Sequence, residues 1–260
     1  MCVLTQAILS AILLTSDKHK ISYDHYECGH KAVVVIAHGF FTSKESVLLK
    51  KLKDGLTDTY DVIMFDFRGH GKSSGLFSWT THESNDLDAV LQYAKTRYTT
   101  IGLIGFSLGA AISINVLSEA DAVDSFIAIS APSDFEKIEY HFWRLNFEED
   151  IVYNCGEGGK GKGIRPGPFW LKKQKPIDAV DKVTIPILYI HGDKDWVVGD
   201  NHSKKLYEKT TAEKKIAIIK NGTHAEYLMR KNSKDVVELI RDWFRQTLTI
   251  ERRKYECPAS

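Results

Sequence analysis

The segment best suited to chemistry is Gly105-Phe106-Ser107-Leu108-Gly109, which has the pattern G-x-S-x-G. The apolar run Ile101–Ile104 leads into it, and the small residues Ala110 and Ala111 follow it. A strand that turns this tightly into a helix strains the backbone of the serine and exposes its Oγ, and the glycines avoid collisions with neighbouring elements. The first N–H groups of the helix also favour negative charge there. We therefore predict that Ser107 is a nucleophile; a serine that only caps a helix is the alternative interpretation.

A serine hydroxyl needs a general base, and the chain offers ten histidines. His224 comes shortly after the predicted strand Lys215–Ile219, so we expect it on the same rim of the sheet as Ser107. Three other histidines also follow predicted strands, but each precedes a glycine in a tight turn and is expected to support a loop: His38, His70 and His191. We therefore predict that His224 is the base.

The base needs an acid that holds its tautomer and stabilises the imidazolium. Asp193 and Asp195 both lie just past the apolar run Ile185–Ile190. The order serine, aspartate, histidine along the chain is the one expected when the nucleophile sits on a strand–turn–helix. We choose Asp195 as the acid and keep Asp193 as the second candidate.

Acyl transfer also requires N–H donors for the tetrahedral oxyanion. One predicted donor is the backbone N–H of Leu108, directly after the nucleophile. The second is expected in the loop after the strand Ala32–Ala37, where Gly39 allows close approach and the N–H of Phe40 is available. The rings of Phe40 and Phe41 would then border the acyl pocket. A plain strand-to-helix turn is the alternative.

Short apolar runs alternate with longer amphipathic ones, which predicts a mostly parallel sheet with helices on both faces. Continuous apolar runs indicate strands covered on both sides: Ala32–Ala37, Tyr60–Phe65, Ile101–Ile104, Ser125–Ile129, Ile185–Ile190 and, more weakly, Lys215–Ile219. Apolar residues at helical spacing indicate helices: Ser84–Tyr98, Leu108–Leu117 and Asp235–Leu248.

The segment 133–175 interrupts this alternation because it contains no buried-strand run. Aromatic residues are followed by a glycine- and lysine-rich loop, Gly156–Gly163, and by Arg165–Trp170. Long loops without a function are uncommon in a compact domain, so we interpret the segment as a lid over the strand ends, between core parts 1–132 and 176–260. An ordinary surface loop is the alternative.

Several aromatic residues of this lid are predicted to line the substrate pocket: Phe142, Trp143, Phe169 and Trp170. Lys160 and Lys162 could attract acidic substrates, but a solvated charged loop is the favoured interpretation.

The 260 residues are 43% hydrophobic, which suits one globular domain. A net charge of +1 argues against a nucleic-acid surface. The apolar run Val3–Leu14 is too short to span a bilayer and lacks a basic leader, so we predict an edge strand rather than an export signal. Four cysteines lack C-x-x-C spacing and are expected to be free thiols in a reducing, cytoplasmic compartment, although a bridge stays open: Cys2, Cys28, Cys155 and Cys257.

Four motifs together resemble the α/β-hydrolase superfamily, and within it the bacterial carboxylesterases and lipases that include feruloyl esterases and monoacylglycerol lipases: His38-Gly39-Phe40, Asp66–Ser73, Gly105–Gly109, and His191–Asp195 with His224. The resemblance implies the α/β-hydrolase fold. It also supports Asp195, because the family's acid is the last residue of HGxxD. In the family the Asp66–Ser73 stretch is a structural loop, so Asp66 and Arg68 receive no catalytic role. The first half is most similar to feruloyl esterases, whereas segment 133–175 matches no lid of known substrate.

The predicted activity is hydrolysis of carboxylic esters through an acyl-enzyme on Ser107. No metal or cofactor is expected, because no cluster of ligands suggests one. The alternatives are thioester or amide hydrolysis or acyl transfer on the same triad, and a non-catalytic scaffold, which the retention of all three residues disfavours. A small-molecule ester is the expected partner, without nucleic acid or an integral membrane segment, and a homodimer is compatible with the sequence.

Overall fold

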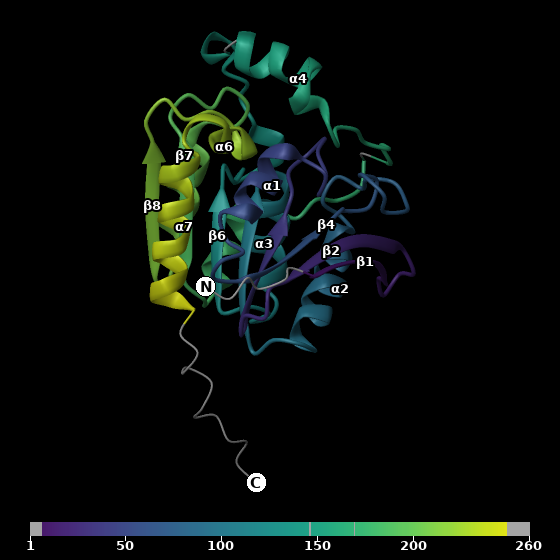
Figure 1. Ribbon diagram of the computed structural model, residues 1–260. Coiled ribbons are helices and arrows are strands. Elements are labelled where there is room, and N and C mark those ends of the chain that lie inside the picture. Colours follow the sequence, from purple (N-terminus) through teal and green to yellow (C-terminus); the bar gives the residue numbers. More distant parts are fainter. Residues whose placement is uncertain (1–6, 146, 169, 249–260) are drawn as a thin grey trace.

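The computed structural model describes residues 7–145, 147–168 and 170–248. Its centre is an eight-stranded sheet in the order β1-β2-β4-β3-β5-β6-β7-β8 (Figure 1). The pairs β1–β2 and β2–β4 are antiparallel, and the other neighbouring strands are parallel. The strands are β1 Ala7–Leu14, β2 Lys20–Glu27, β3 Ala32–Ala37, β4 Asp61–Phe65, β5 Thr100–Phe106, β6 Ser125–Ile129, β7 Ile187–Gly192 and β8 Lys214–Ile219.

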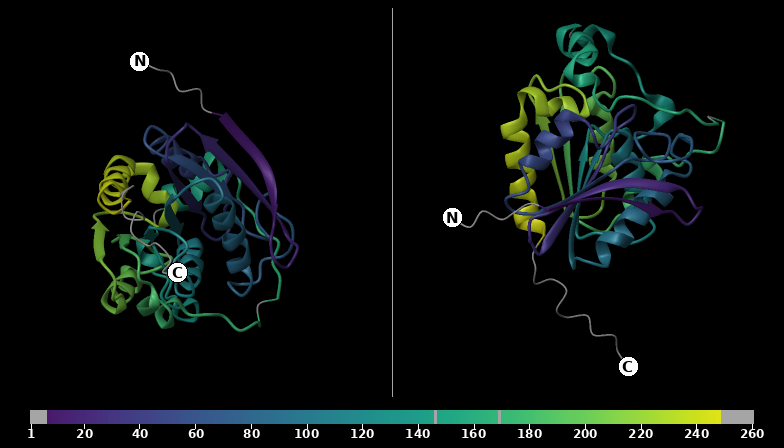
Figure 2. Two further views of the ribbon diagram at one scale, coloured as in Figure 1. Left: turned by 90° about the horizontal axis from the view of Figure 1, so that it is seen from below. Right: turned by 45° about the vertical axis from the view of Figure 1, so that its right-hand side comes forward.

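Helices cover both faces of the sheet (Figure 2). The helices are α1 Val47–Asp54, α2 Glu83–Lys95, α3 Leu108–Leu117, α4 Tyr153–Cys155, α5 Asp200–Lys209, α6 Leu228–Lys231 and α7 Ser233–Thr247, and all but α4 pack on a face of the sheet. Short helical turns are η1 Phe135–Lys137, η2 Phe142–Arg144, η3 Phe147–Val152, η4 Glu157–Gly159, η5 Pro176–Asp178, η6 Val180–Lys182 and η7 Ala225–Tyr227.

The core has two apolar layers, one on each face of the sheet. In β3, Val33 and Val35 belong to the layer that α2, α3 and α5 cover, whereas Val34 and Ile36 belong to the layer that α1, α6 and α7 cover. Because successive side chains of a strand point to opposite faces, a strand between two helical layers is apolar throughout. The predicted α/β-hydrolase fold is therefore confirmed.

The predicted edge strand corresponds to β1, and its first residues, 3–6, lie outside the described residues. β2, α1 and α5 were not anticipated from the sequence. Cys28 and Cys155 are free thiols, while Cys2 and Cys257 lie outside the described residues. Within the described part of the chain, no helix has both the length and the apolar character needed to cross a membrane.

The connection between β6 and β7 holds the unusual segment 133–175. It consists of helical turns and irregular chain, together with an isolated bridge between Phe77 and Pro166. Figure 1 shows that the part around α4 lies above the carboxyl ends of β6, β7 and β8. The segment is thus positioned at the edge of the sheet where doubly wound folds bind their ligands.

The loop after β4 is fixed by a buried cation. Arg68 is 2% exposed and its guanidinium contacts both carboxylate oxygens of Asp86 on α2, at 2.7 to 3.1 Å. The same guanidinium donates to both carboxylate oxygens of Asp17, at 2.7 and 3.0 Å. Arg68 therefore joins the turn before β2 to the helix layer, and its contacts are structural.

We predict that Arg68→Met lowers the free energy of unfolding by about 3–5 kcal/mol, because it leaves Asp86 buried without its charge partner. Urea unfolding followed by circular dichroism measures the loss. Arg97→Met is the matched control: Arg97 pairs with Glu27 on the surface, is 45% exposed, and should cost less than about 1 kcal/mol. Equal losses in the two variants would contradict the structural role of Arg68.

Candidate active site

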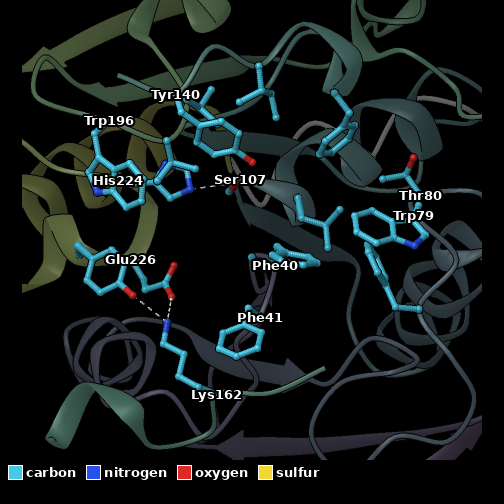
Figure 3. A pocket seen from close by; sticks show the side chains of 18 of the residues that line it. Phe40, Phe41, Trp79, Thr80, Ser107, Tyr140, Lys162, Trp196, His224 and Glu226 are labelled. Atoms are coloured by element: carbon cyan, nitrogen blue, oxygen red, sulfur yellow. Dashed lines mark hydrogen bonds and ion pairs between the residues drawn. The ribbon is translucent and has the colours of Figure 1, made fainter. Parts of the chain in front are cut away.

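Ser107 occupies the turn between β5 and α3 with a left-handed backbone, φ 46° and ψ −108°. This conformation is strained for a residue with a side chain, and it persists only where the surroundings impose it. A Cβ at Gly105 would lie 2.6 Å from Ala110 Cα, and one at Gly109 would collide with the carbonyl oxygen of Ala37. Both glycines are therefore required for the turn, and the turn directs Ser107 Oγ toward His224 (Figure 3).

Three loops bring a serine, a histidine and an aspartate into one hydrogen-bonded row. Ser107 Oγ donates to His224 Nε2 at 3.0 Å, and His224 Nδ1 donates to Asp195 Oδ2 at 2.7 Å. Ser107 follows β5, Asp195 follows β7 and His224 follows β8, so all three come from carboxyl ends of parallel strands. The side chains expected to act together are thus in contact.

Asp195 is held by more than His224. Its Oδ1 accepts the N–H groups of Val197 and Val198 at 3.0 and 2.9 Å, and its Oδ2 lies 3.2 Å from His191 Nε2. His191 is itself fixed, because its Nδ1 accepts from Ser203 Oγ at 2.6 Å. These contacts orient the carboxylate toward His224. His191, expected only to support a loop, also positions the acid.

Asp193, the second candidate for the acid, does not reach the histidine. Its backbone N–H donates to the carbonyl of Ile219, and its Oδ1 is buried without a hydrogen-bond partner among the described residues. The structure therefore brings Asp195 and not Asp193 to His224.

The charges of the row are coupled. Burial raises the pKa of the Asp195 carboxyl, but the nearby His224 and His191 outweigh burial and hold that pKa well below its usual range. Burial lowers the pKa of the His224 imidazole, yet Asp195 outweighs this effect and raises the pKa above its ordinary value. An ionised aspartate beside a more basic imidazole is the electrostatic arrangement that a general base requires.

The backbone N–H groups expected to bind the oxyanion belong to Phe40 and Leu108, which line the same cavity as Ser107. Among the described residues neither group donates a hydrogen bond to the protein, so both are available to a ligand. The loop of Phe40 is anchored by His38, which donates from Nδ1 to the carbonyl of Gly39 at 2.7 Å and accepts at Nε2 from the N–H of Phe67 at 3.0 Å. Burial lowers the pKa of His38 to about 4, so the ring stays neutral and keeps both bonds.

A cavity of about 580 Å³ opens over Ser107 and His224. Aromatic residues form much of its wall: Phe40, Phe41, Phe77, Trp79, Phe135, Tyr140, Trp196 and Tyr227. The remaining lining residues are Gly39, Thr80, Ser107, Leu108, Ile138, Asn154, Lys162, Lys173, Val197, Val198, His224 and Glu226. A concave, largely apolar site with a few convergent polar groups is typical of small-molecule binding.

Only some of the residues predicted to line the substrate pocket lie at the cavity. Phe41 lines it. Phe142, Trp143 and Trp170 do not, and they are 66%, 79% and 74% exposed. The ring of Phe142 packs instead against Tyr140 and Trp196, with its centroid 5.8 Å from each. Phe169 lies outside the described residues.

Other members of segment 133–175 do reach the cavity: Phe135, Ile138, Tyr140, Asn154, Lys162 and Lys173. The expectation that the glycine- and lysine-rich loop is solvated is wrong for Lys162. Its side chain is 15% exposed and its ammonium lies 3.0 Å from Glu226 Oε1, whereas Lys160 is exposed as expected. The fixed partner of Lys162 is remote in sequence, so composition alone did not indicate its burial.

The described residues also include one group of potential metal ligands, Cys28, His30 and Asp61. It lies at the amino end of β4, whereas Ser107 lies at the carboxyl end of β5. Asp61 already accepts the N–H groups of Cys28 and His30 and the hydroxyl of Tyr98. This group is therefore a hydrogen-bonded strand terminus separate from the cavity.

Comparisons with known proteins agree with the fold. A family model described as alpha/beta hydrolase fold matches residues 32–157, and the model of X-Pro dipeptidyl-peptidase (S15 family) matches residues 164–226. Among solved structures, an esterase from Pyrococcus furiosus has a TM-score of 0.73 at 20% identity, with 95% of each chain covered. An esterase from Rhodococcus sp. has a TM-score of 0.76 at 18% identity, covering 92% of this chain and 99% of that one.

The curated relatives are longer proteins, and the chain matches only part of each. The uncharacterized protein YqkD of Bacillus subtilis is 27% identical over 207 residues, which are 74% of this chain and 64% of that protein. Protein ABHD12B of Homo sapiens is 29% identical over 193 residues, which are 68% of this chain and 49% of that protein. The chain thus spans between about half and two thirds of the length of these relatives. Residues 32–157 thus match the model of the alpha/beta hydrolase fold family, and the chain has the α/β-hydrolase fold, as its motifs indicated.

We predict that Asp195→Asn lowers the pKa of His224, because the carboxylate that raises it is removed. An NMR titration of the imidazole Cε1–H resonance measures the shift. Asp193→Asn is the matched control and should leave the titration of His224 close to that of the wild type. A larger shift in the Asp193 variant would show that the other aspartate faces the histidine in solution.

Proposed function

We propose that the protein is a serine esterase that hydrolyses carboxylic esters through an acyl-enzyme on Ser107. The observation that carries this proposal is the hydrogen-bonded row Ser107–His224–Asp195, with spacings of 3.0 and 2.7 Å, at the floor of an aromatic cavity. The names of the structural relatives, esterases of Pyrococcus furiosus and Rhodococcus sp., point to the same reaction class.

The proposed reaction begins when His224 Nε2 accepts the proton of Ser107 Oγ, which forms a bond to the ester carbonyl carbon. The resulting oxyanion accepts hydrogen bonds from the N–H groups of Phe40 and Leu108. His224 then donates the proton to the alkoxy oxygen, the C–O bond breaks and the alcohol leaves. A water molecule, deprotonated by His224, attacks the acyl-enzyme, and the carboxylic acid departs as Ser107 regains its proton.

Each part of the site serves one step of this cycle. The strained turn aims the nucleophile before substrate binds, and the unpaired N–H groups stabilise the charge that develops on the oxygen. Loss of one such donor typically costs about 2.7–4 kcal/mol in the transition state. Asp195 stabilises the imidazolium that forms twice per turnover, because it is fixed by Val197, Val198 and His191. All of these groups belong to the chain itself.

The segment 133–175 is proposed to act as a lid between core parts 1–132 and 176–260. It contributes Phe135, Ile138 and Tyr140 to the cavity wall, and Figure 1 shows it above the strand ends. A cover of this kind excludes water from the reacting ester and supplies contacts for its acyl chain.

Thioester hydrolysis, amide hydrolysis and acyl transfer would use the same residues. Paired assays on an ester and its matching thioester, with and without an added acceptor alcohol, separate these reactions from ester hydrolysis. A fluorophosphonate probe separates all of them from a non-catalytic scaffold, because it labels only a serine that is activated.

We predict that Ser107→Ala reduces hydrolysis of p-nitrophenyl butyrate at least about 10⁴-fold, since the bond-forming atom is lost. Thermal unfolding should be nearly unchanged because only a hydroxyl is removed. Ser118→Ala, at the end of α3, is the control and should keep wild-type activity. Comparable turnover by a purified Ser107→Ala variant would refute the assignment of the nucleophile.

We also predict that Tyr140→Ala lowers the ratio of kcat/KM for octanoyl over acetyl p-nitrophenyl esters by about tenfold, because an aromatic wall of the cavity is removed. Trp143→Ala is the control; its ring is 79% exposed and does not line the cavity. The same change of ratio in both variants, or in neither, would count against a lid that shapes the acyl pocket.

A further inference from the structure

The cavity has two chemically different sides. Figure 3 shows Phe40, Trp79 and Thr80 on one side of Ser107, and Glu226 and Lys162 on the side of His224. Lys162 Nζ lies 3.0 Å from Glu226 Oε1 and 3.0 Å from the hydroxyl of Tyr227. This polar side, made of Lys162, Glu226 and Tyr227, has no role in the bond-making steps of the proposed reaction.

We propose that Lys162, Glu226 and Tyr227 form a subsite for the alcohol part of the substrate, and that it selects uncharged alcohols carrying a second hydroxyl group. The inference rests on the proposed esterase activity and names a substrate class for it: hydroxyalkyl esters rather than alkyl esters.

The alcohol side of the ester is assigned from the proton transfers. The leaving oxygen must lie within reach of His224 Nε2, because that nitrogen protonates it. Glu226 follows His224 by two residues, and a Cβ at Gly39 would lie 3.6 Å from both Glu226 Oε2 and Ser107 Cβ, so Glu226 and Ser107 approach Gly39 together. An alcohol leaving past His224 therefore meets the polar side, and the acyl chain is left with the aromatic side.

The subsite offers both a donor and an acceptor. An ammonium has three N–H groups, and the contacts of Lys162 with Glu226 and Tyr227 use two of them. Glu226 receives Lys162 at Oε1, which leaves Oε2 on the side of Gly39. A hydroxyl is the small group that can accept from the third N–H and donate to a carboxylate oxygen at once.

The charges of the subsite cancel. Burial lowers the pKa of Lys162, but Glu226 and Tyr227 outweigh burial and raise it above the ordinary value. Burial raises the pKa of Glu226, and Lys162 outweighs burial and lowers it. Both groups are therefore ionised, and a second carboxylate brought in by the substrate would face Glu226, while the charge of Lys162 is already balanced by Glu226. The pair favours a neutral polar group over an anion.

The polar side is held in place from two directions. Tyr227 donates its hydroxyl to Asn154 Oδ1 at 2.9 Å, in segment 133–175. The N–H of Gly163, next to Lys162, donates to the carbonyl of Phe41 at 3.3 Å, in the loop that holds a proposed oxyanion donor. A subsite fixed on both sides before substrate binds loses little entropy on binding, as specificity requires.

The test compares two esters of equal size, 2-hydroxyethyl butyrate and propyl butyrate, which differ by a hydroxyl in place of a methyl group. Butyrate release gives kcat/KM for each, and titration with a fluorophosphonate gives the concentration of active serine. For the wild type we expect the hydroxyethyl ester to be favoured at least about tenfold, as a hydrogen bond to a charged group allows. Carboxymethyl butyrate, an anion, should be the poorest of the three.

The variant of choice is Lys162→Met combined with Glu226→Gln, because Lys162→Met alone would leave a buried carboxylate unpaired. Its ratio of hydroxyethyl to propyl ester should fall to within about twofold of unity. Lys160→Met, in the same loop but exposed, is the control and should keep the wild-type ratio.

Equal kcat/KM values for the two neutral esters in the wild type, or a ratio that the double variant preserves, would overturn the subsite while ester hydrolysis stands. Faster hydrolysis of the carboxymethyl ester would also overturn it, because an anion would then be the ligand. If no ester is hydrolysed and no serine is labelled, the proposed function itself fails, and the subsite fails with it.

Discussion

The contact between the start of α3 and the carboxyl end of β3 determines the rest of the site. Gly109 lies against the carbonyl of Ala37 so closely that no side chain fits, and the chain can only enter the helix if Ser107 adopts a left-handed backbone. Burial of apolar residues of β5 in the layers on both faces of the sheet compensates for this strain. The reactive oxygen is thus placed by packing of backbone on backbone, and the loops after β7 and β8 need only bring their side chains to it.

Burial of charge is the second constraint, and it explains why the site has more polar residues than the three in the hydrogen-bonded row. A carboxylate as buried as Asp195 is costly unless its oxygens are satisfied. The backbone N–H groups of Val197 and Val198 and the ring of His191 provide that compensation. The same requirement links Lys162 to Glu226, because neither could be buried at the cavity alone. Each buried charge therefore specifies the position of another residue.

Much of the fold follows from local sequence, because a strand covered on both faces is apolar throughout. Ala32–Ala37 and Ser125–Ile129 were predicted with the boundaries that the structure has. β2 was not recognised, since its buried Asp24 and His25 are polar and depend on Lys44, Tyr93 and Tyr98 from elsewhere in the chain.

In the site, too, local sequence predicted some residues, and contacts between distant parts of the chain determined the others. Ser107 was indicated by a turn that forces its own geometry, and Asp195 and His224 by their places after parallel strands. The orientation of rings in segment 133–175 depends on neighbours distant in sequence, so Tyr140 was missed and Phe142 and Trp143 were placed at the cavity, which the structure does not support. The burial of Lys162 likewise depends on Glu226, 64 residues away.

The position of β8 at the edge of the sheet affects how readily the site loses its base. β5, which carries Ser107, lies between two strands, whereas β8, which precedes His224, has a neighbour on one side only. Edge strands open locally at a lower free energy than central ones. Fraying at this edge would withdraw the base while the nucleophile stays in place, so the protein would pass through a folded but inert form before it unfolds as a whole. The lifetime of the active form would then depend on the edge strand β8 rather than on the core.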